Sequence, residues 1–143
     1  MAGEEEIITQ LSIFVNNEPG RLAGVARTLK DAGVNMKACN LAESTEFGIL
    51  RALVDDPEGA FEKIRAKGLI VKKTGLVGVR VEDSPGALFG AADVLGRAGI
   101  NIEYGYAYSR GGVEAFLMRV DDPGKAVKAL GGAGIPLVKS SEI

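Results

Sequence analysis

The feature that most constrains this 143-residue chain is an ungapped internal repeat. Residues 17–22, Asn-Glu-Pro-Gly-Arg-Leu, return as residues 83–88, Asp-Ser-Pro-Gly-Ala-Leu, so that Pro85 follows Pro19 by 66 residues. The same offset pairs Gly24 with Gly90, Gly33 with Gly99, Asn35 with Asn101, residues 55–57 with 121–123, and Gly68 with Gly134. Because a repeat at a fixed offset marks one supersecondary unit used twice, the sequence predicts a tandem duplication.

Composition limits the class of protein. Hydrophobic residues make up 46% and charged residues 25% of the chain, as in ordinary soluble globular proteins. The balance of 17 basic against 19 acidic residues gives no electrostatic footprint for nucleic acid or an anionic membrane. No apolar run reaches the ~20 residues of a bilayer span, and no signal-peptide pattern opens the chain. We therefore expect a cytoplasmic protein with no nucleic-acid or membrane partner.

Cysteine and histidine counts exclude several chemistries. The chain has one cysteine, Cys39, and no histidine. An internal disulfide, a Cys/His metal cluster and a histidine general base are therefore ruled out. Cys39 corresponds to Gly105 in the second copy, which favours a small strand residue over a reactive thiol. The sequence predicts no catalytic residue, no metal site and no cofactor.

Hydrophobic periodicity predicts the elements of the first copy. Residues 7–15 alternate in the period of two that is typical of a strand. A helix follows, with Pro19 at its first position, Asn17 or Glu18 as its cap and Gly33 as its end. Its apolar stripe has the i, i+3, i+4, i+7 spacing and consists of Leu22, Val25, Ala26 and Leu29.

The remaining elements complete a βαββαβ pattern in each copy, which is the ferredoxin-like arrangement. In the first copy we expect strands over 34–43 and 46–54, a helix between residues 57 and 68, and a strand over 69–73. In the second copy we expect strands over 77–81, 100–108, 113–120 and 136–140, one helix capped by Ser84 and started by Pro85, and another helix over 123–133. The predicted division is a frayed acidic start over 1–6, a first unit over 7–73 and a second over 74–143, with Thr74 and Gly75 as the link.

The junction between the first strand and first helix of each copy suits a small anion or zwitterion. The first turn of a helix offers unpaired N–H groups and the positive end of the helix dipole. Gly20 and Gly86 let a ligand approach the backbone there, and Asn17 and Asp83 can accept from an ammonium group. The side-chain amides of Asn35 and Asn101 join this set if the second strand runs beside the end of the first. The alternative, that Pro-Gly punctuates a helix and that Asn belongs to a turn, remains open.

These residues resemble the ACT domain family. The resemblance rests on a strand, then Asn/Asp-x-Pro-Gly-x-Leu, a short helix, and Ala-Gly-Val/Ile-Asn before a strand, twice over nearly the whole chain. It implies two α+β units, each an antiparallel four-stranded sheet with its helices on one face. It also implies regulation by a small effector, typically an amino acid, held between the first loop of one unit and the second strand of its neighbour. By position, the implied ligand contacts are Asn17, Gly20, Arg21, Leu22, Asn35, Met36, Asp83, Gly86, Ala87, Leu88, Asn101 and Ile102.

Other features have simpler structural explanations. Tyr104, Tyr106 and Tyr108 share one strand face and suggest base stacking, but no basic surface accompanies them, which favours an interface or pocket wall. The acid pairs at residues 55–56 and 121–122 precede helix-starting prolines, which favours capping over a metal or acid–base role. Residues 49–54 are apolar on both strand faces, and we therefore expect the face without helices to be covered by the sister unit or by a homodimer.

The sequence thus predicts a double ACT-domain protein that binds an amino acid and regulates a partner in amino-acid metabolism. The alternative from another class is a ligand-independent regulatory subunit of a biosynthetic enzyme such as acetolactate synthase. An enzymatic role is the interpretation that the sequence favours least.

Overall fold

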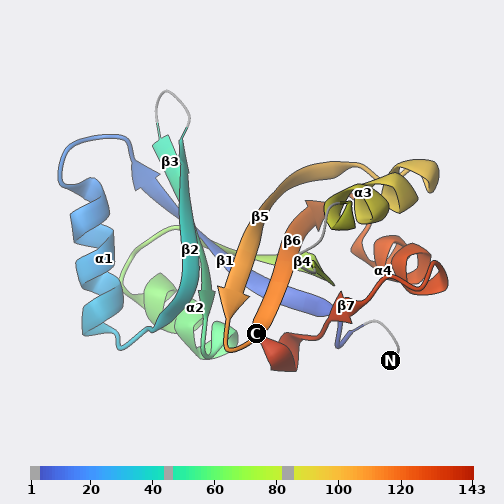
Figure 1. Ribbon diagram of the computed structural model, residues 1–143. Coiled ribbons are helices and arrows are strands. Elements are labelled where there is room, and N and C mark those ends of the chain that lie inside the picture. Colours follow the sequence, from blue (N-terminus) through green and yellow to red (C-terminus); the bar gives the residue numbers. More distant parts are fainter. Residues whose placement is uncertain (1–3, 44–46, 82–85) are drawn as a thin grey trace. The chain divides into compact units, whose positions relative to one another are not determined.

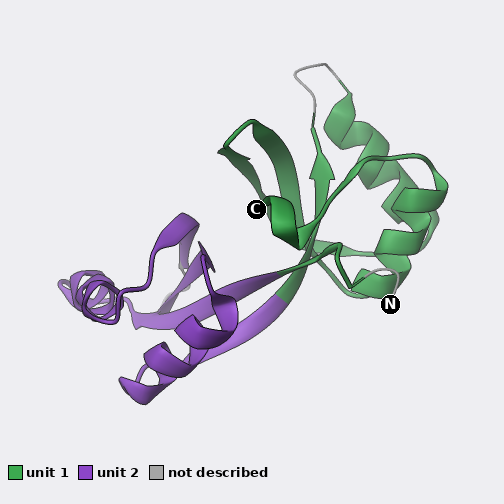
Figure 2. Cartoon of the chain, turned by 90° about the horizontal axis from the view of Figure 1, so that it is seen from below, with its two compact units in different colours: residues 1–8, 75–143 green, residues 9–74 purple. Residues whose placement is uncertain are grey.

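The computed structural model describes residues 4–43, 47–81 and 86–143 (Figure 1). The chain divides into two compact units, which Figure 2 shows in different colours. Unit 2 is Thr9–Thr74 and contains most of the first copy of the repeat. Unit 1 is Gly75–Ile143 together with the residues up to Ile8, and it contains the second copy.

Unit 2 has the predicted βαββαβ order. Its elements are β1 (Ile7–Asn16), α1 (Arg21–Asp31), β2 (Met36–Glu43), β3 (Phe47–Val54), α2 (Pro57–Ala66) and the start of β4 (Val71–Arg80). The strands lie in the order β2-β3-β1, with β4 next to β1. Strands β1 and β2 both pair antiparallel with β3, so that β1 and β2 run in the same direction.

Unit 1 repeats this plan. After β4 come α3 (Ala87–Arg97), β5 (Ile102–Arg110), β6 (Val113–Val120), α4 (Pro123–Gly132), β7 (Leu137–Val138) and a 3₁₀ turn at Ser140–Glu142. Its strands lie in the order β5-β6-β4, and β7 also pairs with β4. The predicted fold class, two ferredoxin-like α+β units in tandem, is confirmed.

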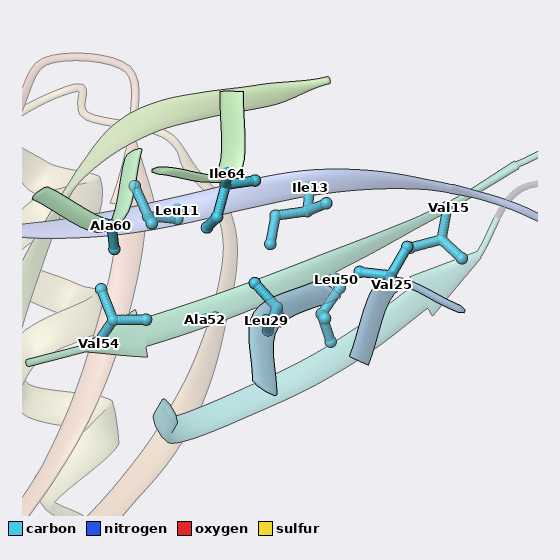
Figure 3. Close-up of a cluster of buried hydrophobic side chains, with 10 residues drawn as sticks. All are labelled: Leu11, Ile13, Val15, Val25, Leu29, Leu50, Ala52, Val54, Ala60 and Ile64. Atoms are coloured by element: carbon cyan, nitrogen blue, oxygen red, sulfur yellow. The ribbon is translucent and has the colours of Figure 1, made fainter. Parts of the chain in front are cut away.

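Each unit has its own apolar core between the sheet and the helices. In unit 2, α1 and α2 both contribute, so both helices cover one face of the sheet (Figure 3). The side chains in Figure 3 are Leu11, Ile13 and Val15 of β1, Val25 and Leu29 of α1, Leu50, Ala52 and Val54 of β3, and Ala60 and Ile64 of α2. In unit 1, Ala91, Leu95, Ala126 and Leu130 pack in the same way against Val77, Val79, Met118 and Val120. Burial of these faces fixes the helices and thereby the loops that precede them.

The structure differs from the predicted elements at several places. The last strand, expected over 136–140, is the two-residue β7, and a 3₁₀ turn begins at Ser140. Helix α3 starts at Ala87 with Gly86 as its N-cap, and the expected cap Ser84 and start Pro85 lie outside the described residues. Strand β4 runs through Thr74 and Gly75, where we expected a link. Helix α1 starts at Arg21 rather than Pro19, and its N-cap is Gly20, with no side-chain cap from Asn17 or Glu18. Glu4–Glu6, at the start that we expected to be frayed, form a turn, and the Glu5 carbonyl accepts from the Ser140 N–H at 2.7 Å.

The predicted caps of the other two helices are present. The Asp56 side chain accepts from the Gly59 N–H at 3.2 Å, and that of Asp122 accepts from the Lys125 N–H at 3.1 Å. A proline follows each aspartate at the first helical position, which suits its fixed φ and missing N–H. These acids therefore cap helices, as the sequence indicated.

In the part of the chain that the structure describes, we find no helix with both the length and the apolar character that a membrane crossing requires.

Candidate functional site

The β1–α1 connection of unit 2 brings an uncapped helix start to the surface. The Glu18 N–H donates to the Asn16 carbonyl at 2.9 Å, and the Arg21 N–H donates to the Glu18 carbonyl at 3.2 Å. Gly20 then turns the chain with a φ of 82°, in the left-handed region that favours glycine. Because no side chain caps α1, the first-turn amides that follow Arg21 lack the acceptor that a cap supplies.

A cleft of about 330 Å³ lies beside this helix start. We call it the loop cleft. It is bounded by the end of β1, the first two turns of α1 and the segment that precedes β4. Its lining residues are Phe14, Val15, Asn16, Gly20, Arg21, Gly24, Val25, Thr28, Gly68, Leu69 and Ile70.

Glycines keep the wall of the loop cleft open. A Cβ atom added to Gly20, Gly24 or Gly68 would meet no atom within 4 Å. The inner part is apolar, since Val15 and Val25 belong to the buried core of unit 2 and Leu69 packs against it. At the outer wall, Phe14 and Ile70 remain 38% and 68% exposed. The cleft therefore joins an apolar floor to a polar rim.

The rim of the loop cleft carries an ion pair. The Arg21 Nε atom donates to Glu18 Oε2 at 3.0 Å. Thr28 is less available, because its hydroxyl donates to the Gly24 carbonyl at 3.1 Å. Glu18 does not itself line the cleft, so Arg21 is the one ionised side chain among the described lining residues.

A second, smaller hollow lies on the other side of the same loop. It measures about 80 Å³ and is lined by Val15, Asn16, Asn17, Glu18, Leu22, Leu41 and Gly48. We call it the sheet-end hollow. The four predicted loop residues are thus divided, with Gly20 and Arg21 at the loop cleft and Asn17 and Leu22 at the sheet-end hollow.

Asn35 and Met36 lie at the opposite end of unit 2. Val15, near the end of β1, pairs with Gly48 of β3, which in turn pairs with Glu43 at the end of β2. Met36, at the start of β2, pairs with Val54 at the far end of β3. At a rise of about 3.3 Å per residue, β2 separates its two ends by roughly 23 Å. Within one unit, therefore, the Asn35 amide does not join the β1–α1 loop. Its Nδ2 atom instead donates to Asp55 Oδ2 at 3.0 Å.

The corresponding residues of unit 1 repeat part of this arrangement. Gly86, with a φ of 93°, is the uncapped N-cap of α3, which begins with Ala87 and Leu88. Asn101 precedes β5 and exchanges two hydrogen bonds with Asp121: its N–H donates to Asp121 Oδ1, and its carbonyl accepts from the Asp121 N–H, each at 3.2 Å. Asp83 lies outside the described residues.

Comparison with known families decides the identity of this fold. A family model described as an ACT domain pair matches residues 6–139. The chain belongs to the ACT domain pair family. The ACT pair is a regulatory domain, and no catalytic family is indicated. No curated protein matches the chain in sequence.

Solved structures resemble this ACT pair over nearly its whole length. Protein BT0572 from Bacteroides thetaiotaomicron shares 32% sequence identity and a TM-score of 0.86, over 96% of this chain and 95% of that one. The ligand-free regulatory subunit of aspartate kinase from Thermus thermophilus shares 16% identity and a TM-score of 0.59, over 92% and 95%. The corresponding subunit from Thermus flavus shares 14% identity and a TM-score of 0.57, over 88% and 92%. The likeness to these two subunits is one of fold.

The remaining candidates in this ACT pair have structural roles. The side chain of Tyr108 is only 4% exposed, and Tyr104 and Tyr106 are half-buried, so the three rings do not form an open stacking surface. Met36 and Ile102, each the first residue of its strand, pack against the cores of units 2 and 1. Among the described residues, no three acids or cysteines are grouped as metal ligands would be.

Sequence reasoning missed most of the lining of the loop cleft in this ACT pair. The unpredicted lining residues are Phe14, Val15, Asn16, Gly24, Val25, Thr28, Gly68, Leu69 and Ile70. The repeat pairs Gly24 with Gly90, and a glycine inside a helix lowers helix stability. That cost was the available signal that Gly24 keeps space open beside α1.

Proposed function

We infer that this ACT pair binds an amino acid as an effector and regulates an enzyme of amino-acid metabolism. Membership of the ACT pair family supports the regulatory part, and the fold likeness to regulatory subunits of aspartate kinase agrees with it. The observation that carries the ligand part is the loop cleft, which lies beside an uncapped helix start and an exposed arginine. Its volume of about 330 Å³ falls at the small end of ligand pockets, which run from ~300 to 1,000 Å³.

In this proposal the β1–α1 loop of unit 2 supplies the primary contacts. Arg21 binds the effector carboxylate, and Gly20 allows the ligand to approach the backbone. Asn17 and Leu22 line the adjoining sheet-end hollow. There they meet groups from a second chain, which by the family resemblance are Asn35 and Met36 of that chain. Regulation requires that the effector bind one arrangement of the protein more tightly than another.

A homodimer fits the surface of unit 2. Large apolar side chains remain exposed around its loop end, namely Phe14, Leu22, Leu41, Phe47 and Ile70. The rings of Phe14 and Phe47 pack together with centroids 5.5 Å apart. Exposed apolar groups gathered in this way are typical of protein interaction sites. We therefore expect self-association, which sedimentation at micromolar concentration will measure.

Thermal melting in the presence of each of the twenty amino acids tests the proposed function. A ligand at 100 times its dissociation constant stabilises the folded protein by ~2.7 kcal/mol, which gives a clear shift in melting temperature. We expect a shift with a small subset of amino acids. A flat panel, combined with co-purification of a large enzyme, would instead support the ligand-independent regulatory subunit.

A further inference from the structure

We propose that the loop cleft of unit 2 holds an α-amino acid with an apolar side chain, and that each chain binds one such molecule. The inference rests on the proposed function and names the class and number of its effectors. In this arrangement, the ligand carboxylate binds Arg21, and its side chain lies over the apolar floor.

The charge distribution around the cleft selects an apolar ligand side chain. Among the described residues that line it, Arg21 alone is ionised. The carboxylate of the ligand satisfies that charge, so a second charge on the ligand side chain would enter the apolar floor without a partner. Such burial is strongly unfavourable. Lysine, arginine, aspartate and glutamate are therefore excluded as tight ligands.

The outer wall of the cleft also selects an apolar side chain. Phe14 and Ile70 are adjacent there, because the Phe14 N–H donates to the Ile70 carbonyl at 3.0 Å. The Phe14 ring packs on Phe47, on the sheet face away from α1, so Ile70 supplies the apolar side chain of this wall, and it is 68% exposed. A ligand side chain seated between Ile70 and Val25 would remove apolar surface from water on both sides, which is favourable in proportion to the area covered.

Unit 1 lacks the groups that this binding mode requires. The residue that corresponds to Arg21 in the repeat is Ala87, which offers no cation. The residue that corresponds to Phe14 is Arg80, and its Nη2 atom forms an ion pair with Oε2 of Glu142. A charged, paired side chain thus occupies the position of Phe14. The second copy therefore does not hold the same ligand, and the expected stoichiometry is one per chain.

A matched pair of glycine variants tests the location. Gly24 lies inside α1 on the wall of the loop cleft, and Gly90 occupies the same position in α3. A Cβ atom added at either position meets no atom within 4 Å, so a side chain is tolerated at both. Gly24→Leu fills the cleft, whereas Gly90→Leu makes the same change to helix propensity in the second copy.

The experiment measures binding of L-leucine, L-isoleucine, L-valine, L-methionine and L-phenylalanine by calorimetry and thermal shift, with L-lysine and L-aspartate as charged probes. We expect at least one apolar amino acid to bind wild type once per chain, to lose at least tenfold in affinity in Gly24→Leu, and to bind Gly90→Leu as it binds wild type.

Three results would overturn the inference while leaving the proposed function intact. They are binding of a charged amino acid in preference to the apolar ones, binding of two molecules per chain, and loss of binding in Gly90→Leu but not in Gly24→Leu. Absence of a response to all twenty amino acids in wild type would overturn both the inference and the proposed effector role.

Discussion

The Nε atom of Arg21 lies 3.0 Å from Oε2 of Glu18 at the rim of the loop cleft, and both side chains are 58% exposed. An exposed pair of this kind contributes only about 0–1 kcal/mol to the free energy of unfolding. The pair is therefore of little importance for the stability of α1.

Arg21→Ala is expected to weaken effector binding without weakening the fold. Affinity should fall by about tenfold or more, since a hydrogen bond to a charged group contributes about 1.5–3 kcal/mol. The free energy of unfolding should change by less than about 1 kcal/mol. Calorimetry and urea unfolding measure the two quantities. Arg27→Ala is the matched control, because Arg27 lies on the same helix and forms an ion pair with Asp31, at 3.9 Å. Equal binding by Arg21→Ala and wild type would exclude the assigned role.

Two glycines four residues apart should respond to alanine with opposite signs. Gly20 has a φ of 82°, where a Cβ atom costs about 1–2 kcal/mol, so Gly20→Ala should lower the free energy of unfolding. Gly24 lies inside α1, where alanine is favoured over glycine by about 0.5–1 kcal/mol, so Gly24→Ala should raise it. Urea unfolding of both variants measures the changes. Changes of the same sign would show that the start of α1 differs from the structure.

The two aspartate caps should contribute equally in the two units. Asp56→Ala and Asp122→Ala each remove an acceptor for a backbone N–H and should each lower the free energy of unfolding by about 0.5–2 kcal/mol. Glu62→Ala, at an exposed position inside α2, is the control and should change it by less than about 0.5 kcal/mol. Equal effects of Asp56→Ala and Glu62→Ala in thermal or urea unfolding would contradict the capping role.

Most of the fold followed from periodic patterns in the sequence. Alternation in residues 7–15 and the stripe from Leu22 to Leu29 record which side of each element is buried, and burial determines where that element packs. The link at Thr74 and Gly75 was wrong because turn propensity is local. The β4 residues on either side of Thr74 and Gly75 pair with neighbouring strands. This pairing keeps the two residues within β4 and outweighs their turn propensity.

The candidate site was predictable only in part. Gly20 carries a local signal, since a glycine at the junction of a strand and a helix can be read directly from the sequence, whereas Arg21 was implied only by the family resemblance. The wall formed by Phe14 and Ile70 depends on a pairing between residues 56 positions apart, which no local pattern contains. Asn35 was grouped with the loop on the condition that β2 begins beside the end of β1. The register shows that it begins at the other end.

The separation of Arg21 from Asn35 makes a shared site testable by mixing variants. If the effector site joins Arg21 of one chain to Asn35 of another, Arg21→Ala and Asn35→Ala should each bind poorly. Asn35→Ala should also lose the hydrogen bond to Asp55, at a cost of about 1 kcal/mol in the free energy of unfolding. After subunit exchange in an equal mixture, half of the dimers are hybrids, and one of the two sites in each hybrid is intact. Calorimetry should therefore recover about a quarter of the wild-type sites. If no wild-type sites were recovered in the mixture, the site would not be shared in this way. If Asn35→Ala by itself bound the effector with wild-type affinity, the effector site would be confined to the loop end of a single unit.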